Sequence, residues 1–160
     1  MSDDSPTDHA GVRIFPPAIF IGGLVIGYAL EWPWPFPIVP PSWSLVIRLA
    51  GVALLGLGLW VMLSALFLFR RRGTPPEPWE PTTTLVLDGP YRFTRNPMYL
   101  GMALVLGGFA LVGNALWPLL AIVPVIWVVR TQVIAKEERY LAAKFGDAYR
   151  DFTTRVRRWF

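Results

Sequence analysis

One stretch of this chain, residues 89–101 (GPYRFTRNPMYLG), gathers side chains that could bind an anion. Pro97 is suited to the first turn of a helix, and Asn96 before it is suited to cap that helix. An arginine beside the free N–H groups of a helix start makes a good anion site, and Arg95 stands at such a place. The alternative is a basic turn that anchors the helix in lipid headgroups, and the spacing alone leaves both interpretations open.

Two adjacent acidic residues, Glu137 and Glu138, form the second candidate. They follow a long apolar run, where a membrane surface usually favours basic residues. Arg130 stands about two helical turns before them. Either these residues belong to one site, or the glutamates lie on a solvated helix and Arg130 reaches the lipid surface.

A third candidate is the pair Glu31 and Arg48, at the ends of two other apolar runs. Charges at such positions usually pair or face a cavity. The pair could be a hydrated structural contact, or Glu31 could be the coupling carboxylate of a small four-helix transporter. Transport would depend on Glu31 and be indifferent to Glu138, whereas chemistry at the first two stretches predicts the reverse.

The composition excludes a soluble globular domain. Of the 160 residues, 54% are hydrophobic and only 16% are charged, against about 45–50% and about 25% in soluble domains. The absence of cysteine excludes a thiolate nucleophile, and a single histidine, His9, excludes a multi-histidine metal site. The net charge of +4 is better explained by membrane orientation than by nucleic acid. We therefore expect no metal and no nucleic-acid partner.

Four apolar segments must position these residues, and we expect all four to cross a lipid bilayer. They are residues 14–30, 49–69, 97–112 and 115–134, of which 49–69 is the clearest. Gly23 and Gly27 have the spacing that lets membrane helices approach closely. Residues 113–114 form a tight turn, and the proline-rich loop 70–96 contains a strand-like stretch at 82–87.

Charge indicates the orientation of the spans. The loop 70–96 carries five arginines and the segment 130–160 carries eight lysines or arginines, while the turns at 31–41 and 113–114 carry none. Positive charge marks the cytosolic side of membrane proteins, so both termini and the loop are expected in the cytosol. The arginine, proline and tryptophan usage indicates a bacterial plasma membrane.

The end of the chain is amphipathic. Asp147 is expected to cap a helix after Gly146, and apolar residues then recur every three or four positions through Trp159. We predict an all-α membrane protein of about four transmembrane helices with a cytosolic, amphipathic C-terminal segment. Its parts are a cytosolic tail (1–13), a first transmembrane hairpin (14–69), a cytosolic loop (70–96), and a catalytic hairpin with the C-terminal helices (97–160).

The two polar stretches and the helical hairpin between them resemble a known family. Residues 89–101, followed by residues 137–159 (EERYLAAKFGDAYRDFTTRVRRW), look like the isoprenylcysteine carboxyl methyltransferase and phospholipid methyltransferase family of integral membrane enzymes. The resemblance covers about residues 85–160. Asn96 stands where the eukaryotic carboxyl methyltransferases have histidine, and residues 101–103 stand where phospholipid methyltransferases have Gly-x-Gly.

The resemblance implies methyl transfer from S-adenosylmethionine, bound at the cytosolic face between the last two spans and the C-terminal helices. The residues it implies for the cofactor pocket are Tyr91, Arg95, Asn96, Tyr99, Gly101, Arg130, Glu137 and Glu138. Among them, Arg95, Tyr99 and Glu138 are the catalytic candidates. The cofactor's carboxylate calls for a cation such as Arg95, its amino group and ribose call for acceptors such as Glu138 and Glu137, and tyrosines offer faces for the sulfonium.

The acceptor of the methyl group stays open at this point. We expect a lipophilic or small acceptor similar to an isoprenylcysteine carboxylate, which needs no base to react. A phospholipid amine or a small thiol is the alternative. The acceptor is expected to arrive from the lipid bilayer, and no metal is required because a methyl group on a sulfonium is already activated.

Overall fold

The computed structural model describes residues 9–12, 14–77 and 79–159, and this part of the chain is all-helical, without a β-strand. The long helices are α1 (Pro16–Glu31), α2 (Ser44–Arg71), α3 (Pro97–Gly113) and α4 (Leu116–Val128). A π-helical segment η3 (Val129–Ile134) joins α4 to α5 (Ala135–Phe145), and α6 (Asp147–Arg155) follows. Two short 3₁₀ helices, η1 (Pro41–Trp43) and η2 (Gly89–Arg92), precede α2 and α3.

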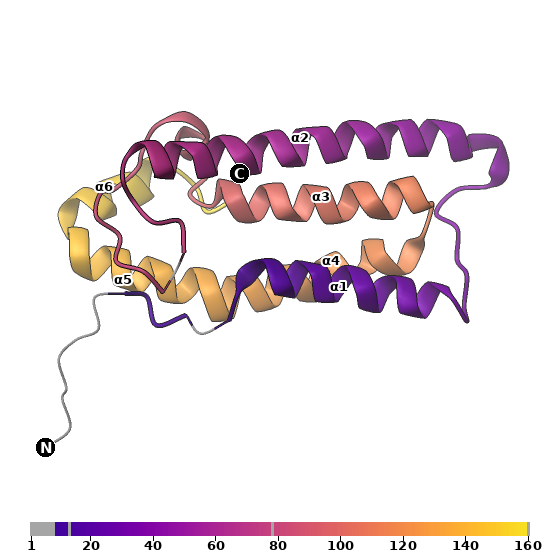
Figure 1. The fold of residues 1–160 in the computed structure, drawn as a ribbon, viewed down its shortest axis with the longest axis horizontal. Helices are drawn as coiled ribbons and strands as arrows, with labels where there is room; N and C mark the ends of the chain where they lie inside the picture. The colour runs from indigo at the N-terminus through magenta and orange to yellow at the C-terminus, as the bar shows by residue number, and fades with distance from the viewer. Residues whose placement is uncertain (1–8, 13, 78, 160) are drawn as a thin grey trace, which may run out of the picture.

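The helices pack in two pairs that lie side by side. Figure 1 shows α2 along α3 in one pair and α1 along α4 in the other. Both α5 and α6 lie at one end of the bundle, beside the end of α2 and the start of α3. The residues of the two polar stretches therefore meet at this end.

Glycines bring α2 and α3 into close contact. A Cβ on Gly58 would lie 2.8 Å from the carbonyl oxygen of Gly101, and a Cβ on Gly101 would lie 2.7 Å from that of Gly58. The same holds seven residues away, where a Cβ on Gly51 would lie 2.9 Å from the carbonyl oxygen of Gly108. Small residues at facing positions let two backbones touch, as in membrane helix pairs.

The predicted close approach at Gly23 and Gly27 is confirmed, and α4 is the partner helix. A Cβ on Gly27 would lie 2.5 Å from the Cα of Pro118, and one on Gly23 would overlap the side chain of Val125. The first two helices in the sequence, α1 and α2, therefore pack on different partner helices. α1 packs on α4, and α2 packs on α3.

The turn at residues 113–114 is confirmed, and it is tied to the loop after α1. Asn114 takes a left-handed conformation with φ of 51°, and its side chain exchanges two hydrogen bonds with the backbone of Val39, at 2.9 and 3.0 Å. Glu31 accepts backbone N–H bonds from Phe36 at 2.5 Å and from Trp117 at 3.4 Å. Among the described residues, Glu31 forms no ion pair with Arg48, so its carboxylate serves the turns at this end of the bundle.

Two helices are long and apolar enough to cross a membrane. They are η1 with α2 (Pro41–Arg71) and the continuous helix from α4 to α5 (Leu116–Phe145), whose apolar part ends at Ile134. α1 and α3 are apolar but shorter, with 16 and 17 residues. Large apolar side chains on the outside of the bundle, such as Trp60 and Val123, are exposed, as expected for helices that contact lipid.

Two local predictions are wrong, and a third is confirmed only in its position. Residues 82–87 do not form a strand, because no second strand lies beside them and the backbone N–H of Thr84 bonds instead to the Thr74 side chain at 3.2 Å. Asp147 does not cap α6: Gly146 takes the cap position, and the Asp147 carboxylate pairs with Arg150 at 3.0 Å. Asn96 stands at the cap of α3, but its side chain makes no capping hydrogen bond.

Candidate functional site

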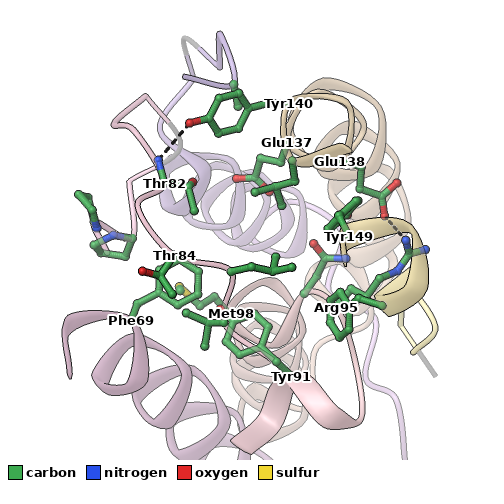
Figure 2. A pocket seen from close by; sticks show the side chains of 18 of the residues that line it. Phe69, Thr82, Thr84, Tyr91, Arg95, Met98, Glu137, Glu138, Tyr140 and Tyr149 are labelled. Carbon is green, nitrogen blue, oxygen red and sulfur yellow. Dashed lines mark hydrogen bonds and ion pairs between the residues drawn. The ribbon is translucent and has the colours of Figure 1, made fainter. Parts of the chain in front are cut away.

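A pocket opens at the end of the bundle where the two polar stretches meet. It contains about 830 Å³ of space between protein atoms, part of it open to solvent. Its walls come from the end of α2, the loop before η2, the start of α3, and the helices α5 and α6 (Figure 2). Six residues expected at the site line it: Tyr91, Arg95, Asn96, Tyr99, Glu137 and Glu138.

Arg95, Glu138 and Arg158 form a charged network on one side of the pocket. Glu138 accepts two bonds from the guanidinium of Arg158, at 3.1 Å from Nε and 2.5 Å from Nη2, and lies 3.3 Å from Nη1 of Arg95. The side chains of Arg95 and Glu138 are only 16% and 17% exposed. Because both Glu138 oxygens are engaged, this carboxylate holds two arginines in fixed positions.

One N–H donor of the Arg95 guanidinium makes no hydrogen bond within the described residues. Its Nε is buried and has no hydrogen-bond partner among the described residues, although a buried donor normally has one. Arg95 also lines the pocket. An anionic ligand in the pocket would satisfy this donor.

Glu137 is held by Tyr99 on the neighbouring helix. The Tyr99 hydroxyl donates a 2.6 Å hydrogen bond to Oε1 of Glu137. Burial raises the pKa of the Glu137 carboxyl from 4.5 to about 7, the bond from Tyr99 opposes this rise, and the nearby Glu138 adds to it. A cationic ligand beside this carboxyl would stabilise its ionised form.

Aromatic side chains form a third part of the wall. Tyr91, Tyr149 and Phe152 are all buried within one apolar cluster, and the rings of Phe69 and Tyr91 lie 5.4 Å apart. Burial is the main cause that raises the pKa of the Tyr149 phenol to about 12, and Arg95 opposes that rise. Tyr149 is therefore a neutral ring beside the Arg95 guanidinium at physiological pH.

The loop between α2 and η2 covers the remaining side. The backbone N–H of Thr82 donates to the Tyr140 hydroxyl of α5 at 3.1 Å (Figure 2). Thr74 and Thr83 share a hydrogen bond at 2.9 Å within the loop. These contacts place Thr84 and Val86 against the pocket.

Comparison with known proteins identifies the family. The sequence model of the phospholipid methyltransferase family matches residues 46–148, which is more than half of the chain. The chain belongs to this family. The match runs from α2 through α5 into the start of α6, so it contains most of the pocket described above.

Two curated relatives are similar to parts of this methyltransferase-family chain. An uncharacterized protein of Haemophilus influenzae is 45% identical over 64 residues, which are 39% of this chain and 98% of that protein. The protein-S-isoprenylcysteine O-methyltransferase of Schizosaccharomyces pombe is 40% identical over 73 residues, 45% of this chain and 30% of that protein. This chain thus matches less than a third of the yeast protein's length. No solved structure matches.

Two residues that the family resemblance implied lie away from the pocket. Gly101 faces α2, where its lack of a side chain allows the contact with Gly58. Arg130 is exposed on the π-helical segment η3 and is not among the residues that line the pocket. Within the described residues, no group of three metal-ligating side chains occurs.

Three residues of this family member's pocket region were not expected from the sequence. Tyr149 and Phe152 belong to the amphipathic face of the C-terminal segment, whose spacing predicted burial but not a pocket. Arg158 follows the last helix and reaches Glu138 only through the turn of the chain after α6. All three residues lie within the second polar stretch, residues 137–159. Its resemblance to the family was the signal that could have indicated them.

Proposed function

We propose that this chain is an integral membrane methyltransferase that uses S-adenosylmethionine and methylates a lipophilic or small acceptor at the cytosolic face. The proposal is carried by one observation. Arg95, whose buried Nε has no hydrogen-bond partner among the described residues, and Glu137 line the same aromatic pocket in a chain of a methyltransferase family.

The residues of the pocket fit the chemical groups of the cofactor. Arg95 would bind the cofactor's carboxylate, because a guanidinium makes charge-assisted hydrogen bonds to such a group. Glu137 would accept hydrogen bonds from the ammonium group or the ribose hydroxyls. Tyr91 and Tyr149 would offer ring faces to the sulfonium or the adenine. The cofactor supplies an activated methyl group when bound, so this chain's residues only bind and orient.

The two glutamates would have different roles. Glu138 already binds Arg95 and Arg158 with both oxygens, so it would act by holding the Arg95 guanidinium in place. Glu137 has an oxygen, Oε2, that no described hydrogen bond uses, so it would contact the cofactor. Asn96 and Tyr99 would support this arrangement from the start of α3.

The acceptor side of the pocket would be apolar. Phe69, Leu85, Val86 and Met98 line it together with the polar residues. An acceptor with a hydrocarbon part would bury apolar surface here. A carboxylate like that of an isoprenylcysteine would be methylated without a base.

Helix lengths and charge support the proposed placement in the membrane. α1 and α3, with 16 and 17 residues, would span about 24–26 Å, close to the bilayer core of about 30 Å. Four spans put the pocket, the loop before η2 and both ends of the chain on one side, which the positive-inside rule assigns to the cytosol. A bacterial plasma membrane is the proposed location.

Transfer of a labelled methyl group tests the proposal. The purified protein in lipid nanodiscs is incubated with labelled S-adenosylmethionine and three acceptors: a prenylated cysteine analogue, a phosphatidylethanolamine and a small alkyl thiol. Product with any acceptor supports the proposed activity and names the acceptor. Glu137→Gln should reduce the rate at least tenfold, since the carboxylate lines the pocket.

Glu31→Gln is the matched control for this assay. It changes a carboxylate at the far end of the bundle, which bonds only to turn backbones among the described contacts. Its rate should equal that of the unchanged protein. Loss of transfer in Glu31→Gln, with Glu137→Gln unaffected, would contradict the proposed site.

A further inference from the structure

The last residues of the chain are tied to the edge of the pocket by their backbone. We call residues 156–159 the C-terminal strap. Val156 ends α6 in an extended conformation, and the backbone N–H of Arg95 donates to the carbonyl of Arg157 at 3.0 Å. Thr94 Oγ1 and Asn96 Nδ2 donate to the carbonyl of Arg158 at 2.9 and 3.1 Å. Three consecutive residues thus hold two consecutive carbonyls.

The strap connects directly to the charged network. Its Arg158 side chain binds both oxygens of Glu138, which in turn lies 3.3 Å from Nη1 of Arg95. A bidentate pair fixes both partners in one orientation. The position of the Arg158 backbone therefore sets the position of Glu138, and Glu138 sets that of the Arg95 guanidinium.

Asn96 and Thr94 are buried polar residues whose side chains donate hydrogen bonds to the strap. Thr94 is 3% exposed and Asn96 is 9% exposed. Asn96 stands at the cap of α3, where a side chain would normally bond to the helix, yet its amide turns to the Arg158 carbonyl instead. Burying a polar group costs free energy unless the group is hydrogen-bonded. The Arg158 carbonyl of the strap accepts the hydrogen bonds of Thr94 and Asn96, and the same bonds hold the strap in place.

We propose that Asn96 and Thr94 are positioning residues for the methyl-transfer site. They hold the Arg158 carbonyl, so that the Arg158–Glu138 pair presents the Arg95 guanidinium to the carboxylate of the methyl donor. In this role neither residue would act on the reacting methyl group. This inference rests on the proposed function, and it assigns Asn96 a role in shaping the site from the edge.

A double-mutant cycle tests the connection. S-adenosylmethionine binding is measured by calorimetry on the full chain in nanodiscs, for Asn96→Leu, Arg158→Gln and the double variant. Asn96→Leu should weaken binding about fivefold, as expected for one lost hydrogen bond that positions a charge. In the Arg158→Gln background, Asn96→Leu should add less than twofold, because the connection is already cut.

A structural role alone would give a different pattern. Thr131→Val removes a hydroxyl bond to the Trp127 carbonyl, 2.9 Å long and away from the pocket, and serves as the matched control for Thr94→Val. Thr94→Val should weaken binding and Thr131→Val should not. The KM for the methyl donor should rise in Thr94→Val more than kcat falls.

The outcomes separate the two proposals. Unchanged affinity in both Asn96→Leu and Thr94→Val would overturn the positioning role while leaving the cofactor site intact. The positioning role would also be overturned if Asn96→Leu weakened S-adenosylmethionine binding by the same factor with and without Arg158→Gln. The effect of Asn96 would then not depend on Arg158. No binding by the unchanged protein would overturn the proposed function and this role with it.

Discussion

The charge state of Glu137 near neutral pH depends on its surroundings. Its carboxyl is ordinarily ionised above pH 4.5, but burial raises its pKa to about 7. The neutral form is therefore favoured in the folded protein, and the contribution of Glu137 to stability falls as the pH rises from about 4.5 to about 7. A cationic ligand reverses this preference, because it stabilises the ionised form.

The affinity for S-adenosylmethionine should therefore depend on pH. If Glu137 binds a cationic or hydrogen-bond-donating group of the cofactor, affinity should rise about tenfold between pH 6 and pH 8, as the carboxyl ionises. Calorimetry across this range measures it. The Glu137→Gln variant should bind weakly with little pH dependence. An unchanged slope in that variant would assign the titration to another group.

Glu138 should matter through the arginines it holds. Replacing it by alanine leaves two guanidinium groups near each other without the carboxylate, and breaking a buried ion pair is costly. We expect Glu138→Ala to abolish measurable cofactor binding. Arg150→Ala, which breaks an exposed pair with Asp147, should bind normally. Retained affinity in Glu138→Ala would remove this residue from the site.

At the scale of elements, the glycines of α2 and α3 set the distance between α2, which ends at Arg71, and α3, which begins at Pro97. Gly58 and Gly101 touch through their backbones. Both helices contribute side chains to the pocket, including Phe69 and Tyr99. The spacing of the helices therefore determines the width of the site.

Alanine substitutions in α2 test this packing. Gly58→Ala would place a methyl group 2.8 Å from the Gly101 carbonyl oxygen, whereas Gly56→Ala meets nothing within 4 Å. We expect Gly58→Ala to destabilise by about 1–3 kcal/mol, as overpacking does, with a lower Tm in thermal unfolding. Gly56→Ala should leave Tm unchanged or slightly higher. Equal Tm values for both variants would contradict the helix contact.

Much of the helical layout could be predicted from apolar runs and turn residues. The bounds of α1 and α3 and the turn at 113–114 lie close to those predicted from apolar residues, prolines and Asn114. α2 begins at Ser44, before the apolar run predicted from residue 49. The irregular course of residues 82–87 could not be predicted, because it depends on hydrogen bonds to Thr74 and to Tyr140 of α5. The π-helical segment η3 was not predicted either. The pairing of α1 with α4 is likewise a tertiary choice.

The site was only partly predictable for the same reason. The family resemblance of residues 89–101 and of the Glu137–Glu138 pair predicted six residues that line one pocket. Gly101 belongs to the first polar stretch, but it faces α2 instead of the pocket. Arg130 precedes the two glutamates on the same continuous helix, but it lies in the π-helical segment η3 and outside the pocket lining. Arg158 reaches the site through a chain reversal that no local pattern encodes.

At the scale of the whole molecule, the two ends of the bundle differ in chemistry. One end carries the turns held by Glu31 and Asn114, and the other carries the pocket, the arginine-rich loop and the C-terminal helices. Exposed tryptophans, Trp32, Trp34 and Trp43, gather near the first end. This asymmetry supports a bundle that spans a bilayer with the pocket on the cytosolic side.

Cysteine labelling tests this orientation, and the chain contains no cysteine of its own. Single variants Ser42→Cys, before α2, and Thr153→Cys, on α6, are expressed in bacterial cells and treated with a membrane-impermeant maleimide. Ser42→Cys should be labelled in intact cells, and Thr153→Cys only after the membrane is opened. Labelling of Thr153→Cys in intact cells would reverse the orientation.

The central claim is that Arg95 and Glu137 bind S-adenosylmethionine in this pocket. The most direct measurement is calorimetry of S-adenosylmethionine on the purified protein in nanodiscs, with Arg95→Gln and Glu137→Gln beside Arg150→Gln as the control. We expect saturable binding in the unchanged protein and in the control, and at least a tenfold loss in each pocket variant. No binding in well-folded unchanged protein, or equal binding in all four proteins, would contradict it.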